Sequence, residues 1–422
     1  MALFCQPVAA APVVVRRDGR VQARGHLADH VRLGVLEDHL PAGLVEELVA
    51  RYQVGGQRVR GLSAGMAARC VLAMTVLPGA CGREVMATVA GQLAFVPWQR
   101  PWRVPGREVL GRWRRRLGVE LFTELFWRSA MVAAAEGEHT DPQPDGVGGW
   151  LGGLLVCSVD GTQVRCPDTE ADREAFGSSG TADDSAPYPM VRAVLVTAAA
   201  SRTVLAAAVD GSHVGEQTLI ARLVADHPQA FAGRLFLFDR NYLGGALVAA
   251  ILAAGGHVLM RVKSDITLPV LGWRRDGSYD SVLGGATEPI PVRVVEYDVT
   301  TPANANAEGA EGAENEPASG GQELFCLVTD LTDDEKYPAR VLCAAYPLRW
   351  SGSETTIKEN KTTITDAGPS IGPIFRSRTP DMIRQEFWAW LATTNLIRAE
   401  ARRAARQATG LPCLSLCTSS RV

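Results

Sequence analysis

The chain has 422 residues, of which 46 % are hydrophobic and 21 % are charged. This length exceeds one average domain, so we expect two or three domains, and the formal net charge of −3 argues against a uniformly basic nucleic-acid binder. Basic and acidic side chains number 18 and 12 in residues 1–140, 13 and 28 in residues 141–336, and 12 and 6 in residues 337–422. Two basic ends therefore flank an acidic middle.

The N-terminal third is predicted to be helical. We expect residues 1–24 to be flexible and residues 25–140 to form an all-α domain. Apolar residues recur at helical spacing between positions 27 and 80, with Pro41 near the start of one helix and Ser63 suited to cap another.

A basic stretch follows at residues 98–118, where seven arginines and three tryptophans accompany one acidic residue. One interpretation is a solvated helix face in a chain with 39 arginines and four lysines. The other is a DNA-binding surface, because guanidinium groups bind phosphate oxygens bidentately. Its candidate residues are Arg112, Arg114, Arg115 and Arg116.

From about residue 150 the hydrophobic pattern changes from helical to extended. Three strands are expected in succession, followed by a helix, a strand, a helix and a strand, over residues 150–264. This βββαβαβ order predicts an α/β fold with a mixed sheet. The apolar run Gly244–Met260 is interrupted by two glycines, which indicates a buried helix that runs into a strand, and no membrane span.

Two acidic residues stand at the ends of apolar strands. Asp160 ends the run LLVCSVD and Asp239 ends the run LFLFD. A carboxylate in such a place is costly unless it is hydrogen-bonded, paired or bound to a metal, and a capping or turn aspartate is the alternative for each alone. If the two strands are neighbours, both carboxylates converge at one edge of the sheet.

Residues 265–345 break the α/β rhythm. Short strand-like runs lie on either side of an acidic, low-complexity loop at about residues 301–321, which we expect to be disordered. We interpret the region as an inserted β-rich subdomain.

The segment YPLRWSGSETTIKENK, residues 346–361, carries a third acid and a group of DNA-binding candidates. Glu354 is the candidate third metal ligand, with Glu359 as a weaker alternative. Tyr346, Arg349 and Lys361 add a hydroxyl and two cations that suit a phosphate clamp. Residues 346–410 would complete the α/β domain, and residues 411–422 form an irregular tail.

This segment resembles the Y-R-E-K signature of IS4-type DDE transposases, and VDGTQVRCPDTEADREAFG and FLFDRNY resemble the regions that carry the first and second aspartates. The resemblance implies an RNase H-like catalytic core interrupted by a β-rich insertion. Asp160, Asp239 and Glu354 would then be catalytic and bind two Mg²⁺ ions, with Mn²⁺ able to substitute. The spacing departs from the family pattern, because four residues instead of three separate Arg349 from Glu354.

The predicted function is therefore a transposase that binds terminal inverted repeats as a homodimer, cleaves DNA with Mg²⁺ and joins it to target DNA. An inactive copy that only binds DNA is the alternative, and a free-standing nuclease is a third. Nine cysteines without C-x-x-C spacing predict reduced, mostly buried thiols. We expect a protein of the bacterial cytoplasm, associated with the nucleoid and without a membrane partner.

Overall fold

The computed structural model describes residues 13–15, 21–23, 40, 43–54, 62–77, 79–92, 103–137, 149–177, 188–284, 288–300, 322–350, 352 and 375–409. Several predicted features lie outside these residues: Glu354, Glu359 and Lys361, the acidic loop at 301–321, and the tail at 411–422.

Among its described residues, the N-terminal region contains a short strand pair and five helices. Within residues 1–24, predicted to be flexible, Val13–Val15 pairs antiparallel with Val21–Ala23, as β-branched residues favour. Ser63 caps its helix as predicted, since its hydroxyl accepts from the Met66 N–H at 3.1 Å. The elements are β1 (Val13–Val15), β2 (Val21–Ala23), α2 (Leu44–Arg51), α3 (Ala64–Val76), α4 (Gly82–Gln92), α5 (Arg107–Leu117) and α6 (Glu120–Gly137).

The rest of the described chain is built on one ten-stranded sheet with the order β6-β5-β4-β7-β8-β12-β11-β10-β9, and β3 pairs with β4. Strand β5 runs antiparallel to both of its neighbours, β4 and β6, whereas β7 and β8 run parallel to β4. The first elements are β3 (Trp150–Leu151), β4 (Leu154–Arg165), α7 (Glu170–Phe176), β5 (Met190–Ala198), β6 (Val204–Gly211), α8 (Glu216–Asp226), η1 (Pro228–Ala230), β7 (Arg234–Phe238), η2 (Arg240–Tyr242), α9 (Gly245–Ala253) and β8 (His257–Arg261). The mixed α/β character predicted for residues 150–264 is confirmed, but the three strands do not follow in direct succession, because helix α7 lies between β4 and β5.

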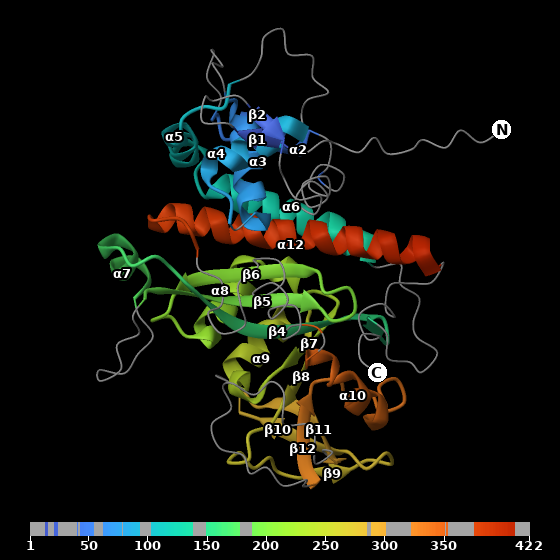
Figure 1. Cartoon of the computed structure of the whole chain (residues 1–422). Coiled ribbons are helices and arrows are strands. Elements are labelled where there is room, and N and C mark those ends of the chain that lie inside the picture. The colour runs from blue at the N-terminus through green and yellow to red at the C-terminus, as the bar shows by residue number, and fades with distance from the viewer. Residues whose placement is uncertain are drawn as a thin grey trace, which may run out of the picture.

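The predicted insertion continues this sheet. Strand β12 pairs with β8, and β11, β10 and β9 follow it outward, so these strands belong to the central sheet. Figure 1 shows them at the end of the molecule opposite to α2–α5. The elements are β9 (Gly272–Trp273), β10 (Tyr279–Leu283), β11 (Ile290–Thr300), β12 (Gln322–Thr329), α10 (Ala339–Ala345) and α12 (Pro380–Thr409).

Helix α12 joins the N-terminal helices to the sheet. In Figure 1 it lies beside α6, between α2–α5 and the strands β4–β6. One apolar core holds Phe122 and Phe126 of α6, Phe387 and Leu391 of α12, and Leu195 of β5. The side-chain amide of Asn395 also bonds both the N–H and the C=O of Val204 at 2.9 Å, at the start of the edge strand β6.

The two faces of the sheet carry different partners. Cys157 and Val159 of β4 share a core with α8 and α9, whereas Val156 on the other face packs with α10 and Tyr346. Successive residues of a strand point to opposite faces, so Ser158 and Asp160 lie on the face of Tyr346. Within the described residues, no helix combines the length and apolar character needed to cross a membrane.

Candidate active site

Asp160 and Asp239 lie side by side on neighbouring parallel strands. The pairing of β4 with β7 runs from Leu155 opposite Arg234 to Ser158 opposite Leu237. Continued for two residues, this register sets Asp160 opposite Asp239, and neighbouring strands are about 4.8 Å apart. The two predicted carboxylates therefore lie beside each other on the face that carries Tyr346. Asp239 directly follows the end of β7 as expected, but Asp160 does not end its strand, because β4 continues to Arg165.

Each aspartate is held by a local hydrogen bond. Asp160 Oδ1 accepts from the Gly161 N–H at 2.9 Å, and Asp239 Oδ1 accepts from the Arg240 N–H at 2.6 Å, where Asp239 caps the short helix η2. Both side chains are half-buried. These bonds orient the two carboxylates.

Arg261 extends this row of charged residues by one strand. The pairing of β7 with β8 ends at Phe238 opposite Met260, so Asp239 stands beside Arg261. The guanidinium carbon of Arg261 lies 4.0 Å from the centroid of the Phe325 ring. The sequence analysis missed Arg261, although its position just before the end of the apolar run HVLMRV was a signal of the same kind as that of Asp239.

Tyr346 and Arg349 are near the aspartates but buried. Tyr346 is fully buried and donates from its hydroxyl to the Phe238 carbonyl at 3.2 Å, directly before Asp239. Burial raises the pKa of Tyr346 to about 12, with Arg349 lowering it and Asp239 raising it. Arg349 is 7 % exposed, and its guanidinium lies 5.1 Å from the Trp350 ring. Little of either side chain is exposed in this conformation, and contact of these two residues with DNA stays a prediction.

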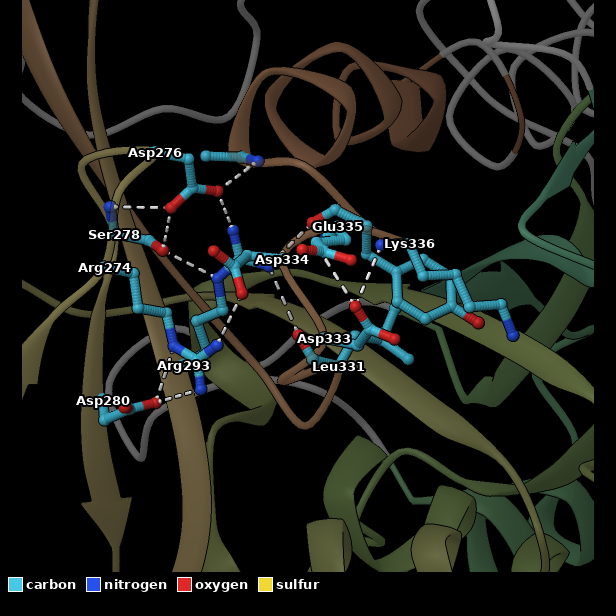
Figure 2. A network of polar contacts seen from close by, with 12 residues as sticks. Arg274, Asp276, Ser278, Asp280, Arg293, Leu331, Asp333, Asp334, Glu335 and Lys336 are labelled. Atoms are coloured by element: carbon cyan, nitrogen blue, oxygen red, sulfur yellow. Dashed lines mark hydrogen bonds and ion pairs between the residues drawn. The ribbon is translucent and has the colours of Figure 1, made fainter.

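A network of hydrogen bonds around Arg293 and Asp276 fixes the start of α10, the helix that directly precedes Tyr346. Arg293 on β11 is fully buried and donates to the Tyr337 carbonyl at 2.7 Å, to Ser278 Oγ at 2.7 Å and to Asp276. Asp276 also accepts from the Ala339 N–H at 2.8 Å, at the first residue of α10. Figure 2 shows how the turn between β9 and β10 and the segment before α10 meet around this arginine.

Gly352, two residues before the predicted third acid, packs on the strand that carries Asp160. Gly352 packs so tightly on β4 that an added Cβ would lie 2.5 Å from Ser158 Oγ and 3.1 Å from the Ala199 Cα. Ser158 precedes Asp160 by two residues on the same face of the strand. Glu354 itself lies outside the described residues, and among those residues no group of three or more His, Cys, Asp or Glu side chains suits a metal ion.

Two parts of the chain match known protein families. Residues 30–127 match the N-terminal family of insertion element 4 transposases, and residues 152–396 match the transposase DDE domain. The chain belongs to the IS4 family of DDE transposases. The transposase InsG for insertion sequence element IS4 of Escherichia coli (strain K12) is 24 % identical over 376 residues, which cover 89 % of this chain and 78 % of that protein.

One solved structure similar to this transposase is the cryo-EM structure of the piggyBac transposase synaptic complex with hairpin DNA. It aligns with a TM-score of 0.42 and 9 % sequence identity, over 92 % of this chain and 77 % of that one.

The arginines of the basic helix α5 differ in exposure. Arg112, Arg115 and Arg116 are exposed, and Arg116 lies 5.0 Å from the Trp113 ring. Arg114 is 6 % exposed and donates to Ser377 Oγ at 2.7 Å and to the Met382 carbonyl at 2.8 Å. Arg114 thus joins α5 to the segment that enters α12, and its binding to DNA stays a prediction.

A further pair beside the two aspartates was missed. The Tyr242 hydroxyl donates to Glu216 Oε2 at 2.7 Å, and Tyr242 is 3 % exposed. Burial, with the charges of Glu216, Asp160 and Asp239, raises the pKa of Tyr242. The only sequence signal for Glu216 is an acid in the first turn of a helix, which is also what ordinary helix stabilisation requires.

The described cysteines carry no disulfide. Cys70, Cys157 and Cys166 are buried, Cys326 and Cys343 are half-buried, and Cys81 is exposed. Burial raises the pKa of each of the three buried thiols to about 12. The prediction of reduced thiols agrees with these six residues.

Proposed function

We propose that this chain has an RNase H-like catalytic core and catalyses metal-dependent DNA cleavage and strand transfer at the ends of its own insertion sequence. The observation that carries the proposal is the register between β4 and β7, which sets Asp160 beside Asp239. The order β6-β5-β4-β7-β8, with three antiparallel strands followed by two parallel ones, supports the fold assignment.

The proposed metal ligands are Asp160, Asp239 and Glu354. Their carboxylates are hard oxygen donors, the kind that selects Mg²⁺ or Mn²⁺, so the donor set fits two such ions. Bound ions of this kind activate the attacking water or hydroxyl and stabilise the leaving oxygen. Glu354 is supported by the contact of Gly352 with Ser158, because two residues of chain span at most about 7 Å.

The proposed DNA-binding residues fall in two places. Arg112, Arg115 and Arg116 on the exposed side of α5 would bind the phosphates of the terminal inverted repeats. Arg349 and Lys361, with Tyr346, would hold the DNA next to the bond that is cut. For Tyr346 and Arg349 this role requires a change of conformation on DNA binding, because both are buried here.

We assign a separate function to each part of the chain. Residues 25–140 recognise the ends, residues 150–264 and 346–410 form the catalytic core, and residues 265–345 are inserted into it. Target DNA would enter the same site after cleavage, and two copies of the chain would hold the two ends of the element in a homodimer. The acidic middle of the chain would repel DNA until cations neutralise its carboxylates.

The experiment is a cleavage assay on the DNA that flanks this gene, in Mg²⁺ and in Mn²⁺. Wild type is compared with Asp239→Asn and Glu354→Ala, and binding to the same DNA is measured by gel shift. We expect wild type to cut at a discrete boundary and both variants to bind without cutting. Binding without cutting by wild type would favour the inactive copy, to which the longer Arg349–Glu354 spacing also points. Cutting that ignores the end sequence would favour a free-standing nuclease.

A further inference from the structure

Glu216 and Tyr242 lie behind the two aspartates, on the opposite face of the sheet. Tyr242 packs in the apolar core that β4 shares with α8 and α9, and its ring centroid is 5.5 Å from that of Phe238. Asp160 lies on the other face, with Ser158. The pair therefore touches the backbone that carries the aspartates without competing for the space in front of them.

The carboxylate of Glu216 rests directly on Gly161. A Cβ added at Gly161 would lie 2.0 to 2.3 Å from the Glu216 carboxylate atoms, so only glycine leaves room for it. Gly161 is also the residue whose N–H orients Asp160. Glu216 is thereby packed against the chain at the first aspartate.

Tyr242 connects the same carboxylate to the second aspartate. The Tyr242 N–H donates to the Asp239 carbonyl at 3.1 Å, which closes the turn η2 behind Asp239. Gln217, the next residue of α8, donates from its side chain to the Asn241 carbonyl in the same turn. The first turn of α8 thus bridges Gly161 on β4 and the turn after β7.

We propose that Glu216 and Tyr242 are positioning residues that set the spacing of the Asp160 and Asp239 carboxylates for the binding of divalent cations. The proposal rests on the proposed function of the two aspartates. Glu216 acts through its hydrogen bond and its packing on Gly161, and Tyr242 acts through the turn at Asp239. Partners in this outer layer of a metal site typically change metal affinity about 10- to 100-fold.

The chain offers a matched control. Tyr279 is also buried, at 6 % exposure, and its hydroxyl donates to Glu296 Oε1 at 2.9 Å. This second tyrosine–glutamate pair joins β10 to β11, in the outer part of the sheet. Tyr279→Phe removes the same kind of hydrogen bond as Tyr242→Phe without altering the region of the aspartates.

The experiment titrates Mn²⁺ into the full-length chain and follows two responses, the rise in melting temperature without DNA and the rate of DNA cleavage. We expect Tyr242→Phe and Glu216→Ala to need about 10-fold more Mn²⁺ than wild type for half of each response. Glu216→Gln, which still accepts from Tyr242, should stay within about threefold of wild type, and so should Tyr279→Phe.

Two results would overturn the positioning role of Glu216 and Tyr242 but leave the proposed function of the aspartates intact. One is a Tyr242→Phe titration that matches that of Tyr279→Phe, and the other is a Glu216→Gln titration as weak as that of Glu216→Ala, which would assign the effect to charge. A wild-type chain that responds to Mn²⁺ in neither measurement would overturn the proposed function as well. Mn²⁺ responses that are intact in Glu216→Gln and weakened in Tyr242→Phe would establish that the hydrogen-bonded pair positions the aspartates.

Discussion

Arg114 and Ser377 are hydrogen-bonded across 263 positions of sequence, with 2.7 Å between Nη2 and Oγ. Ser377 in turn donates to Glu386 on α12, and Arg376 donates to the Met74 and Ala80 carbonyls near the end of α3. The segment that enters α12 is thereby fastened to both α3 and α5. The exposed arginines of α5 are carried by a helix whose inner side is anchored to the C-terminal helix.

The first prediction concerns stability. Arg114→Ala should lower the free energy of unfolding by about 2–4 kcal/mol, because it removes two buried hydrogen bonds and a positive charge near the buried Glu386. Urea unfolding measures this loss. Arg112→Ala, on the exposed side of the same helix, serves as the control and should change stability by less than about 0.5 kcal/mol. Equal losses in the two variants would contradict a buried anchor.

The second prediction concerns DNA binding. Arg115→Ala should fold normally, weaken binding to the ends of the element and reduce the salt dependence of binding by about one unit of slope, as loss of one phosphate contact does. Gel shifts over a range of salt concentrations provide the measurement. Arg222→Ala removes an exposed arginine on α8 and should leave the slope unchanged. An unchanged slope in Arg115→Ala would remove α5 from the proposed DNA interface.

The third prediction concerns pH. Burial alone would raise the pKa of Asp276, but hydrogen bonds from Ser278 and Ala339 and the charge of Arg293 outweigh it and hold this pKa below its usual value. The unfolded state therefore binds more protons, so this stabilisation is complete above about pH 5 and is lost as the pH falls toward the folded pKa. Urea unfolding at several acidic pH values should show a shallower loss of stability in Asp276→Asn than in wild type. Asp265→Asn, at an exposed position, should follow the wild-type curve.

The fourth prediction concerns the approach to Glu354. Gly352→Ala should lower the cleavage rate at least about 10-fold while DNA binding persists, because the methyl group would push the chain away from Ser158 and Ala199. The matched control is Gly272→Ala, where an added Cβ meets no atom within 4 Å. Wild-type cleavage by Gly352→Ala would show that the close contact with β4 has no part in the reaction.

The apolar runs that end at Asp160 and Asp239 are local patterns, so the sequence shows them directly, although β4 continues past Asp160 to Arg165 and α7 follows it. Each aspartate ends an apolar run, and the change from helical to extended spacing near residue 150 is strong. Their adjacency also follows from the parallel pairing of β4 with β7. The third ligand stays a prediction, since Glu354 lies outside the described residues.

Other features of the structure could not be predicted, because they depend on contacts between residues far apart in the sequence, which no local sequence pattern indicates. Arg114 is buried because residues more than 260 positions away cover it, so it could not be separated in sequence from Arg115 and Arg116. Gly152 and Gly153 take positive φ angles of 57° and 89° and turn β3 back onto β4, a pairing that the strand pattern of the sequence did not indicate. Glu216 became recognisable only through its place on Gly161.

The packing of α12 on α3 and α6 has a consequence for biosynthesis. The apolar surfaces of α3 and α6 are complete long before residues 380–409 are made, because some 240 residues separate the end of α6 from the start of α12. At about 5–20 residues per second, the ribosome needs roughly 12–50 s to deliver the missing helix. During that interval the nascent N-terminal helices expose apolar surface that the finished protein buries, so we expect early termination to leave an aggregation-prone product.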